Sequence, residues 1–255
     1  DHPEYPSQDI AHVASLRLDC LLPAPLPAPV RIDDVTGLII AALCLLVTHF
    51  GIAGSSLRPR LVAAIGEPGY RAVYSVVALA ATVWLVMAWR TAPFVELWPA
   101  GPGVRHLPLL VMPAALLLLA CGVLQRNPTA IGGGSGEARG MLRVTRHPVM
   151  WGIGLWALVH ILANGDLAAA LFFATFAILA FGGMATLDRK YAARDPAGWR
   201  QLAASTSSLP FKAILDGRQQ LRPGEIGWAP LAVAAGLFVL LLLLHPWVIG
   251  VSPLG

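Results

Sequence analysis

The fold of this chain is decided by residues 148–187, which read PVMWGIGLWALVHILANGDLAAALFFATFAILAFGGMATL. The stretch holds two apolar runs, each close to the roughly 20 residues that a helix needs to cross a hydrocarbon core of about 30 Å. Asn164 and Gly165 form a helix stop between the runs, and Asp166 is a natural N-cap for the second one. The stretch therefore predicts two transmembrane helices joined as a tight antiparallel hairpin.

Four more uncharged runs flank this hairpin and predict further spans. In chain order the six predicted spans are residues 35–57, 72–89, 107–124, 148–165, 167–187 and 228–251. Charged residues are only 13% of the chain, about half the roughly 25% of a soluble domain, and hydrophobic residues are 56%. This composition excludes a soluble or disordered protein. We expect an all-α integral membrane protein, a polytopic bundle of about six transmembrane helices.

Several functional classes are excluded by the motifs that the chain lacks. Its three cysteines, Cys20, Cys44 and Cys121, form neither a disulfide framework nor a CxxC metal site. The glycine run 132–136 lacks the pattern of a phosphate-binding loop, and no hydrolase or metalloprotease motif is present. In a membrane protein the basic pI of about 9.3 concerns topology and lipid headgroups, so we expect membrane lipids, and no nucleic acid, as partners.

The distribution of lysine and arginine predicts the orientation. The first, third and fifth loops carry 3, 4 and 7 basic residues, which together are 14 of the 18 in the chain. Positive residues collect in cytoplasmic loops. We therefore expect the odd-numbered loops in the cytoplasm and both termini in the periplasm, with the protein in a bacterial inner membrane.

Two segments fall outside the spans. Residues 1–32 include a Pro-Ala-Leu tract and no recognisable signal peptide, and we expect a weakly ordered N-terminal extension ahead of a six-helix domain over residues 33–255. Residues 188–225 are too long for a simple connection. Their mixture of aromatic and basic residues suits a cytoplasmic segment at the membrane surface, and a folded cap packed on the bundle is an equally good interpretation.

Histidines are the ionisable residues left inside the spans. His49, His160 and His245 lie late in the first, fourth and sixth spans, and no Asp, Glu, Lys or Arg lies well inside any span. The absence of carboxylates argues against a proton relay, while neutral imidazoles suit a metal or haem iron. From helix rise, the depths of His49 and His160 differ by roughly 9 Å, which permits a pair of axial ligands without demanding one. The alternative is that both are interhelical hydrogen-bond donors.

Further candidate residues surround the fourth span. Arg146 and His147 precede Pro148, a pattern of ordinary helix starts that also suits an anion or a lipid headgroup. Trp156 lines either a cofactor pocket or, the preferred interpretation, the core. Asn164 and His245 lie toward the outer ends of their spans and complete the possible further site.

The chain resembles the NnrU family of membrane proteins, and within it the 15-cis-zeta-carotene isomerases. The resemblance rests on residues 143–152 and 155–166, on the segment 49–58, on the long last loop over 205–219 and on the pair His245-Pro246. It extends over about residues 35–250.

The resemblance implies a haem b enzyme that isomerises the central 15-cis bond of zeta-carotene to trans. It implies that His49 and His160 are the axial ligands of the haem iron and that the substrate is a lipid-soluble polyene; the sequence does not identify an electron donor. The family's cysteine three residues before the second histidine is Ala157 here, which puts a Cys/His ligand exchange in doubt.

Two other functions remain open. One is a non-enzymatic haem or redox accessory protein of nitrite and nitric oxide respiration, as the NnrU name implies. The other is an S-adenosylmethionine-dependent membrane methyltransferase, since Arg146-His147-Pro148 with the later Tyr191 and Trp199 also resembles the isoprenylcysteine type. In this chain only Asp188 stands near the acidic residues that such enzymes use.

Overall fold

The structure, a computed structural model, describes residues 33–127 and 137–254, so the predicted N-terminal extension lies outside the described residues. In chain order the elements are α2 (Asp33–Leu46), the π-helix η1 (Val47–Ala53), α3 (Leu57–Thr91), α4 (Pro102–Arg105), α5 (Leu107–Leu124), η2 (Gly140–Arg143), α6 (Pro148–Asn164), α7 (Leu167–Arg194), α8 (Pro196–Ser205), α9 (Lys212–Leu215), η3 (Pro223–Glu225) and α10 (Trp228–Val248). Within the described ranges the only strand-like pairing is one isolated bridge between Glu96 and Asp166. The predicted all-α fold is confirmed.

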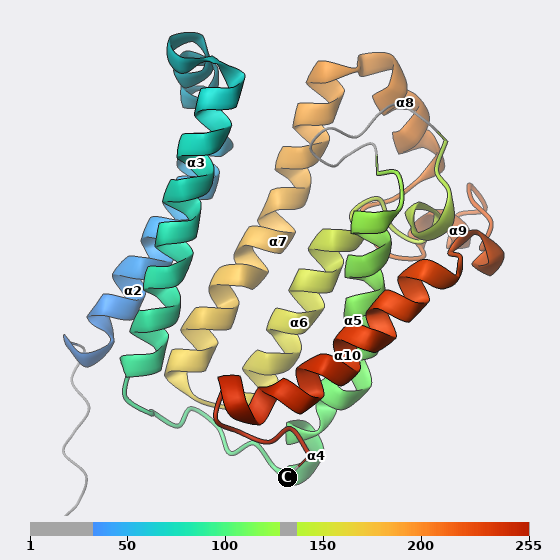
Figure 1. The fold of residues 1–255 in the computed structure, drawn as a ribbon. Coiled ribbons are helices and arrows are strands. Elements are labelled where there is room, and N and C mark those ends of the chain that lie inside the picture. The colour runs from blue at the N-terminus through green and yellow to red at the C-terminus, as the bar shows by residue number, and fades with distance from the viewer. Residues whose placement is uncertain (1–32, 128–136, 255) are drawn as a thin grey trace, which may run out of the picture. The chain divides into compact units, whose positions relative to one another are not determined.

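Each of the six predicted spans corresponds to a helix. Among the described residues five helical segments are long and apolar enough to cross a membrane, and α6 is apolar but shorter, at 17 residues. Helix α6 packs between α5 and α7, α10 packs on α5, and the pair α2–α3 packs on the other side of α7 (Figure 1). This order defines two ends: the α4 end, where α6 finishes and α7 begins, and the α8 end, where α7 finishes.

The turn between α6 and α7 forms as the sequence predicts. Gly165 has the left-handed φ of 71° that ends a helix, and the Asp166 side chain accepts a 2.9 Å hydrogen bond from the backbone N–H of Ala169. The Gly165 carbonyl accepts from the N–H groups of Leu97 and Trp98, at 2.8 and 3.1 Å. The hairpin is thereby tied to the segment before α4.

The first two spans differ from the prediction. The first ends as a π-helix at Ala53 rather than at Leu57. Residues of the predicted loop 58–71 are helical on both sides of Gly66, whose non-helical backbone (φ 74°, ψ 162°) divides α3 into two helices at a kink. The second helix resumes at Pro68, whose fixed φ suits a first helical position, and the Glu67 carboxylate lies 2.7 Å from Arg58 before the kink and 2.9 Å from Arg71 after it. The predicted break is therefore present, as a kink between two helices rather than as a loop.

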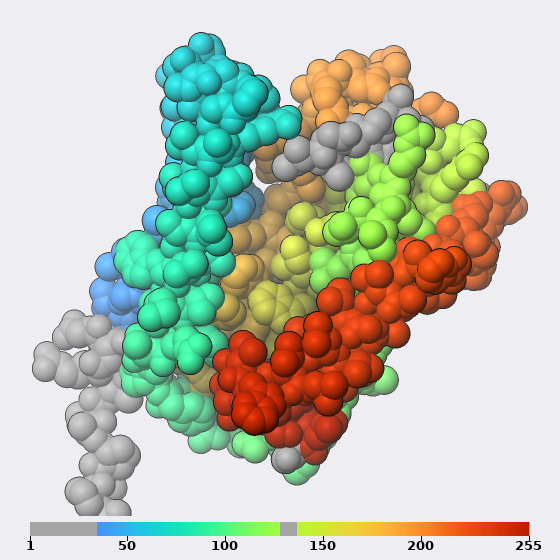
Figure 2. Space-filling model, in the orientation of Figure 1, coloured from blue at the N-terminus to red at the C-terminus, as the bar shows by residue number. Residues whose placement is uncertain are grey.

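Apolar side chains cover much of the outer surface. In the most apolar 18-residue stretch of α3 only 11% of the residues are buried, and in that of α10 only 6%. The largest core cluster instead gathers around α7, at residues such as Phe172, Phe173 and Leu45. Figure 2 shows a hollow between α3 on one side and α5 and α10 on the other, with α6 and α7 at its floor. Such surfaces suit contact with lipid chains, because exposing them to water would be unfavourable.

The long last loop is a folded cap. Helix α7 extends to Arg194, beyond the predicted end of its span, and α8 follows at once. Tyr191, Leu202 and Ala138 are buried in one cluster, and Ala213 in α9 is fully buried. The second interpretation of residues 188–225 is thus the one that the packing supports, while their place at a membrane surface stays a prediction.

Candidate functional site

His160 is held on α6 with one ring nitrogen already occupied. Its Nδ1 lies 2.7 Å from the backbone carbonyl of Trp156, and its ring packs on Phe173 at 5.0 Å between centroids. A carbonyl can only accept, so Nδ1 carries the proton and Nε2 of the neutral ring keeps its lone pair. This is the arrangement of a metal-ligating histidine, which donates its other ring N–H to a backbone carbonyl or a carboxylate.

His49 has the same arrangement in a different local structure. It lies in the π-helix Val47–Ala53, a form that is frequent at functional sites. Its Nδ1 lies 3.0 Å from the Leu45 carbonyl, and its ring meets the ring of Tyr74 edge to face at 5.8 Å. Nε2 is again the nitrogen left available. No pattern in the sequence predicts the π-helix.

Helix α7 shows how far apart in depth the two histidines lie. His160 packs on Phe173, whereas Phe50, the neighbour of His49, lies against Gly182. These two positions on α7 are nine residues apart, an axial rise of about 13 Å. Helices α2 and α6 run in opposite directions (Figure 1). Each imidazole leans toward the N-terminus of its own helix, because its Nδ1 meets a carbonyl four residues earlier. The two side chains therefore lean toward a common level, although no hydrogen bond or ring contact joins them.

A cavity of about 790 Å³ lies at the α4 end. Its polar lining comes from the junction of α4 and α5, from the end of α6, and from the end of α10 and the segment after it: Arg105, His106, His160, Asn164, His245 and Ser252. None of the lining residues, all within the described ranges, is acidic. The Asn164 side chain donates a 2.7 Å hydrogen bond to the His160 carbonyl. The structure thus brings His160, Asn164 and His245 together, and adds Arg105 and His106, which the sequence did not indicate as site residues.

Trp156 belongs to the core, as preferred from the sequence. Its ring meets Phe173 and Phe176 edge to face, at 5.1 and 5.3 Å. Because its carbonyl holds His160, Trp156 positions the imidazole through its backbone while its side chain packs against α7.

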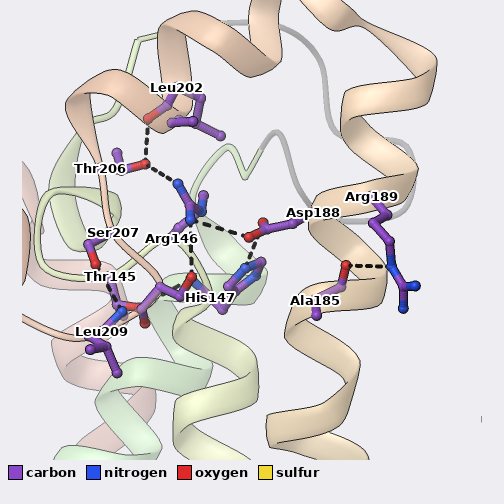
Figure 3. A network of polar contacts seen from close by, with 12 residues as sticks. Thr145, Arg146, His147, Ala185, Asp188, Arg189, Leu202, Thr206, Ser207 and Leu209 are labelled. Carbon is purple, nitrogen blue, oxygen red and sulfur yellow. Dashed lines mark hydrogen bonds and ion pairs between the residues drawn. The ribbon is translucent and has the colours of Figure 1, made fainter.

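Arg146 and His147 lie at the opposite, α8 end and share one carboxylate. Asp188, on α7, lies 3.2 Å from Arg146 Nη2 and 2.8 Å from His147 Nε2 (Figure 3). The Arg146 side chain also donates to Ser208 at 3.0 Å and lies 4.9 Å over the ring of Trp199. Burial lowers the pKa of the Arg146 guanidinium, an effect that the charge of Asp188 opposes. The basic pair is therefore neutralised inside the protein instead of presented to an anion.

The His147 ring is almost completely buried, with 1% of the residue exposed. Its Nε2 lies 2.8 Å from Asp188 Oδ1, which is within the distance of an ion pair. The two atoms do not form a hydrogen bond, because the ring N–H does not point at the oxygen. Within the described residues Nδ1 has no hydrogen-bond partner. Asp188 is engaged by two basic side chains, so the methyltransferase interpretation gains no support from it.

A second ion pair at the α8 end was not foreseen from the sequence. Arg143 binds the Glu225 carboxylate in a bidentate manner, at 2.7 and 2.9 Å, and the N–H of Gly140 donates to the same group at 2.9 Å. These contacts lower the pKa of Glu225 to about 2, with the hydrogen bond from Arg143 as the largest cause. The pair joins η2 to η3, which are 82 residues apart at this contact, and no local pattern signals such a distant partner.

Comparisons with known proteins identify the relatives of this chain. The family described as "NnrU protein" matches residues 37–253, a range that contains both His49 and His160. Two curated relatives carry the name 15-cis-zeta-carotene isomerase, chloroplastic. The protein from Zea mays is 26% identical over 197 residues, covering 72% of this chain and 52% of its own length. The protein from Arabidopsis thaliana is 26% identical over 208 residues, covering 74% and 54%. The chain thus spans about half the length of these relatives, and no solved structure matches it.

Proposed function

The chain belongs to the NnrU family, and we propose that it is a haem b-dependent membrane enzyme that converts the 15-cis bond of zeta-carotene to trans. The observation that carries the proposal is that both curated relatives bear the name of this activity, while the family match covers both available histidines. At 26% identity the relatives support an isomerase-like function, and the substrate and the cofactor are our proposals.

His49 and His160 would hold the haem iron. The support is their chemistry: each ring donates through Nδ1 to a carbonyl four residues earlier and keeps the Nε2 lone pair that iron requires. When bound, the haem would supply an electron-rich iron centre that transiently weakens the double-bond character of the polyene.

The protein's own contribution would be an apolar and shielded place for the substrate. A carotenoid dissolves only in lipid, and the apolar faces of α3 and α10 would border the membrane through which it arrives. Phe173 packs beside the His160 imidazole and Tyr74 beside that of His49, so each proposed ligand has an aromatic neighbour. The charge distribution supports an orientation with the α8 end in the cytoplasm.

The cofactor is tested by an absorption spectrum of the detergent-purified protein supplied with haem. We expect a Soret band whose position shifts in His49→Ala and in His160→Ala, because each variant loses one of the two residues that would hold the iron. Arg90→Gln, a change at the exposed end of α3, serves as the control and should keep the wild-type spectrum. The absence of any Soret band in the wild-type protein would overturn the haem proposal.

The reaction is tested separately, by incubating the haem-loaded protein with 15-cis-zeta-carotene and separating the isomers by chromatography. We expect the trans product in the wild type and none in His160→Ala. Bound haem with no product would instead favour the second candidate, a haem-binding accessory protein without turnover, which membership of the NnrU family supports equally well.

A further inference from the structure

The cavity at the α4 end has a charge pattern that selects for an anion. Arg105 is its only permanently charged lining residue, and no acidic residue lines it, all lining positions being described. An arginine stays protonated at any physiological pH and presents several N–H donors to a carboxylate. An anionic group entering this cavity would therefore meet a cation without displacing an internal partner.

The imidazoles of the cavity are oriented by the backbone. His106 Nδ1 lies 2.7 Å from the Pro102 carbonyl, and His245 Nδ1 lies 2.7 Å from the Val251 carbonyl. In both rings Nε2 is left to meet a ligand, as an acceptor while the ring is neutral and as a donor once it is protonated. The cavity lining thus combines a cation and adaptable polar groups with apolar residues such as Leu109 and Pro108.

His160 connects this cavity with the proposed haem site, because it is both a proposed ligand and part of the cavity wall. Haem b carries two propionate groups on one edge of an otherwise apolar ring. An open cavity that has no acidic lining residue and is bordered by His160 is suited to that edge. Its volume lies within the usual range of ligand sites.

We propose, as an extension of the proposed haem function, that the cavity at the α4 end binds the propionate carboxylates of the haem, with Arg105 as the ion-pair partner. His106 and His245 complete the polar rim, and the hydrogen bond of Asn164 to the His160 carbonyl fixes the end of α6 that borders it. Arg105 is exposed, so its contribution is moderated by solvent.

The test compares two ligands and three proteins. Haem and haem dimethyl ester, which lacks the two carboxylates, are titrated by Soret absorbance into the wild type, Arg105→Gln and Arg90→Gln. We expect Arg105→Gln to weaken the binding of haem by up to about fivefold, the upper end of the effect of losing one exposed ion pair. The same change should leave the ester's affinity unaltered, and the Soret position should stay that of the wild type, because no ligand is lost.

The control Arg90→Gln removes a basic residue that does not line the cavity and should bind both ligands as the wild type does. Equal affinities of Arg105→Gln and the wild type for haem would overturn the inference, as would an equal loss for haem and its ester. Either result leaves a Soret band in place, so it is distinct from a wild-type protein that binds no haem, the outcome that overturns the proposed function itself. Far-ultraviolet circular dichroism of each variant shows that it is folded.

Discussion

Two Arg-His pairs with nearly the same local sequence have opposite surroundings in this protein. Arg105-His106 precedes α5 and Arg146-His147 precedes α6; in each case the histidine is the N-cap and a proline lies in the first helical positions. At the α4 end the pair is exposed beside a cavity without acidic residues. At the α8 end the pair is buried against Asp188. The difference teaches that one distant carboxylate decides whether such a pair stabilises the fold or remains open to a ligand.

Asp188→Asn should have the largest effect, because it removes the carboxylate that distinguishes the two Arg-His pairs. Removing the charge leaves Arg146 buried without its acidic partner beside the buried His147, and breaking a buried ion pair costs about 3 kcal/mol of unfolding free energy. Chemical denaturation in detergent micelles measures the change. The control is Asp216→Asn, which removes an exposed carboxylate that pairs with Lys212 and Arg218 and should alter stability little. Equal effects of the two variants would show that Asp188 is no more important than a surface charge.

Gly165→Ala tests the opposite end with a smaller expected effect, about 2 kcal/mol of unfolding free energy. Gly165 has φ 71°, and an added Cβ would collide with the Trp98 carbonyl, so the turn after His160 would have to shift. Gly236→Ala on α10 is the matched control, since a Cβ there meets nothing within 4 Å. The same denaturation experiment compares them. A Gly165→Ala protein as stable as Gly236→Ala would mean that the turn tolerates a side chain.

The smallest effect should come from lowering the pH, which protonates Glu225 at the α8 end. The pKa of Glu225 falls from an ordinary 4.5 to about 2 in the folded protein, so its ion pair with Arg143 stabilises the fold above pH 4.5. That stability is lost as the pH falls from about 4.5 to 2. We expect Glu225→Gln to flatten the pH dependence of unfolding in this window. A pH profile identical to that of the wild type would contradict this assignment.

Much of the architecture was predictable because it depends on local composition. The uncharged runs predicted a helix for each of the six spans, and the Asn164–Asp166 turn formed with the expected cap. The prediction was less accurate at the ends of the elements. The first span ends in a π-helix at Ala53, and most of the loop predicted over residues 58–71 is helical, with the break confined to the kink at Gly66.

The candidate site was only partly predictable for the same reason. His49 and His160 were identified because a polar ring in an apolar run requires a partner. The orientation of their ring nitrogens depends on carbonyls four residues earlier and could have been suspected from helix geometry. The cavity that joins His160 to His245 and Arg105 could not, since its walls come from three separate parts of the chain.

The sequence by itself therefore determined that this is a membrane bundle, which segments are helical and which residues are chemically unusual within them. These properties follow from the cost of placing charge in hydrocarbon and from the caps that end a helix. Only the tertiary structure decided which Arg-His pair is neutralised and which one borders an open cavity. The reason is that electrostatic partners such as Asp188 and Glu225 come close through folding, 42 and 82 residues along the chain from the arginines that they bind.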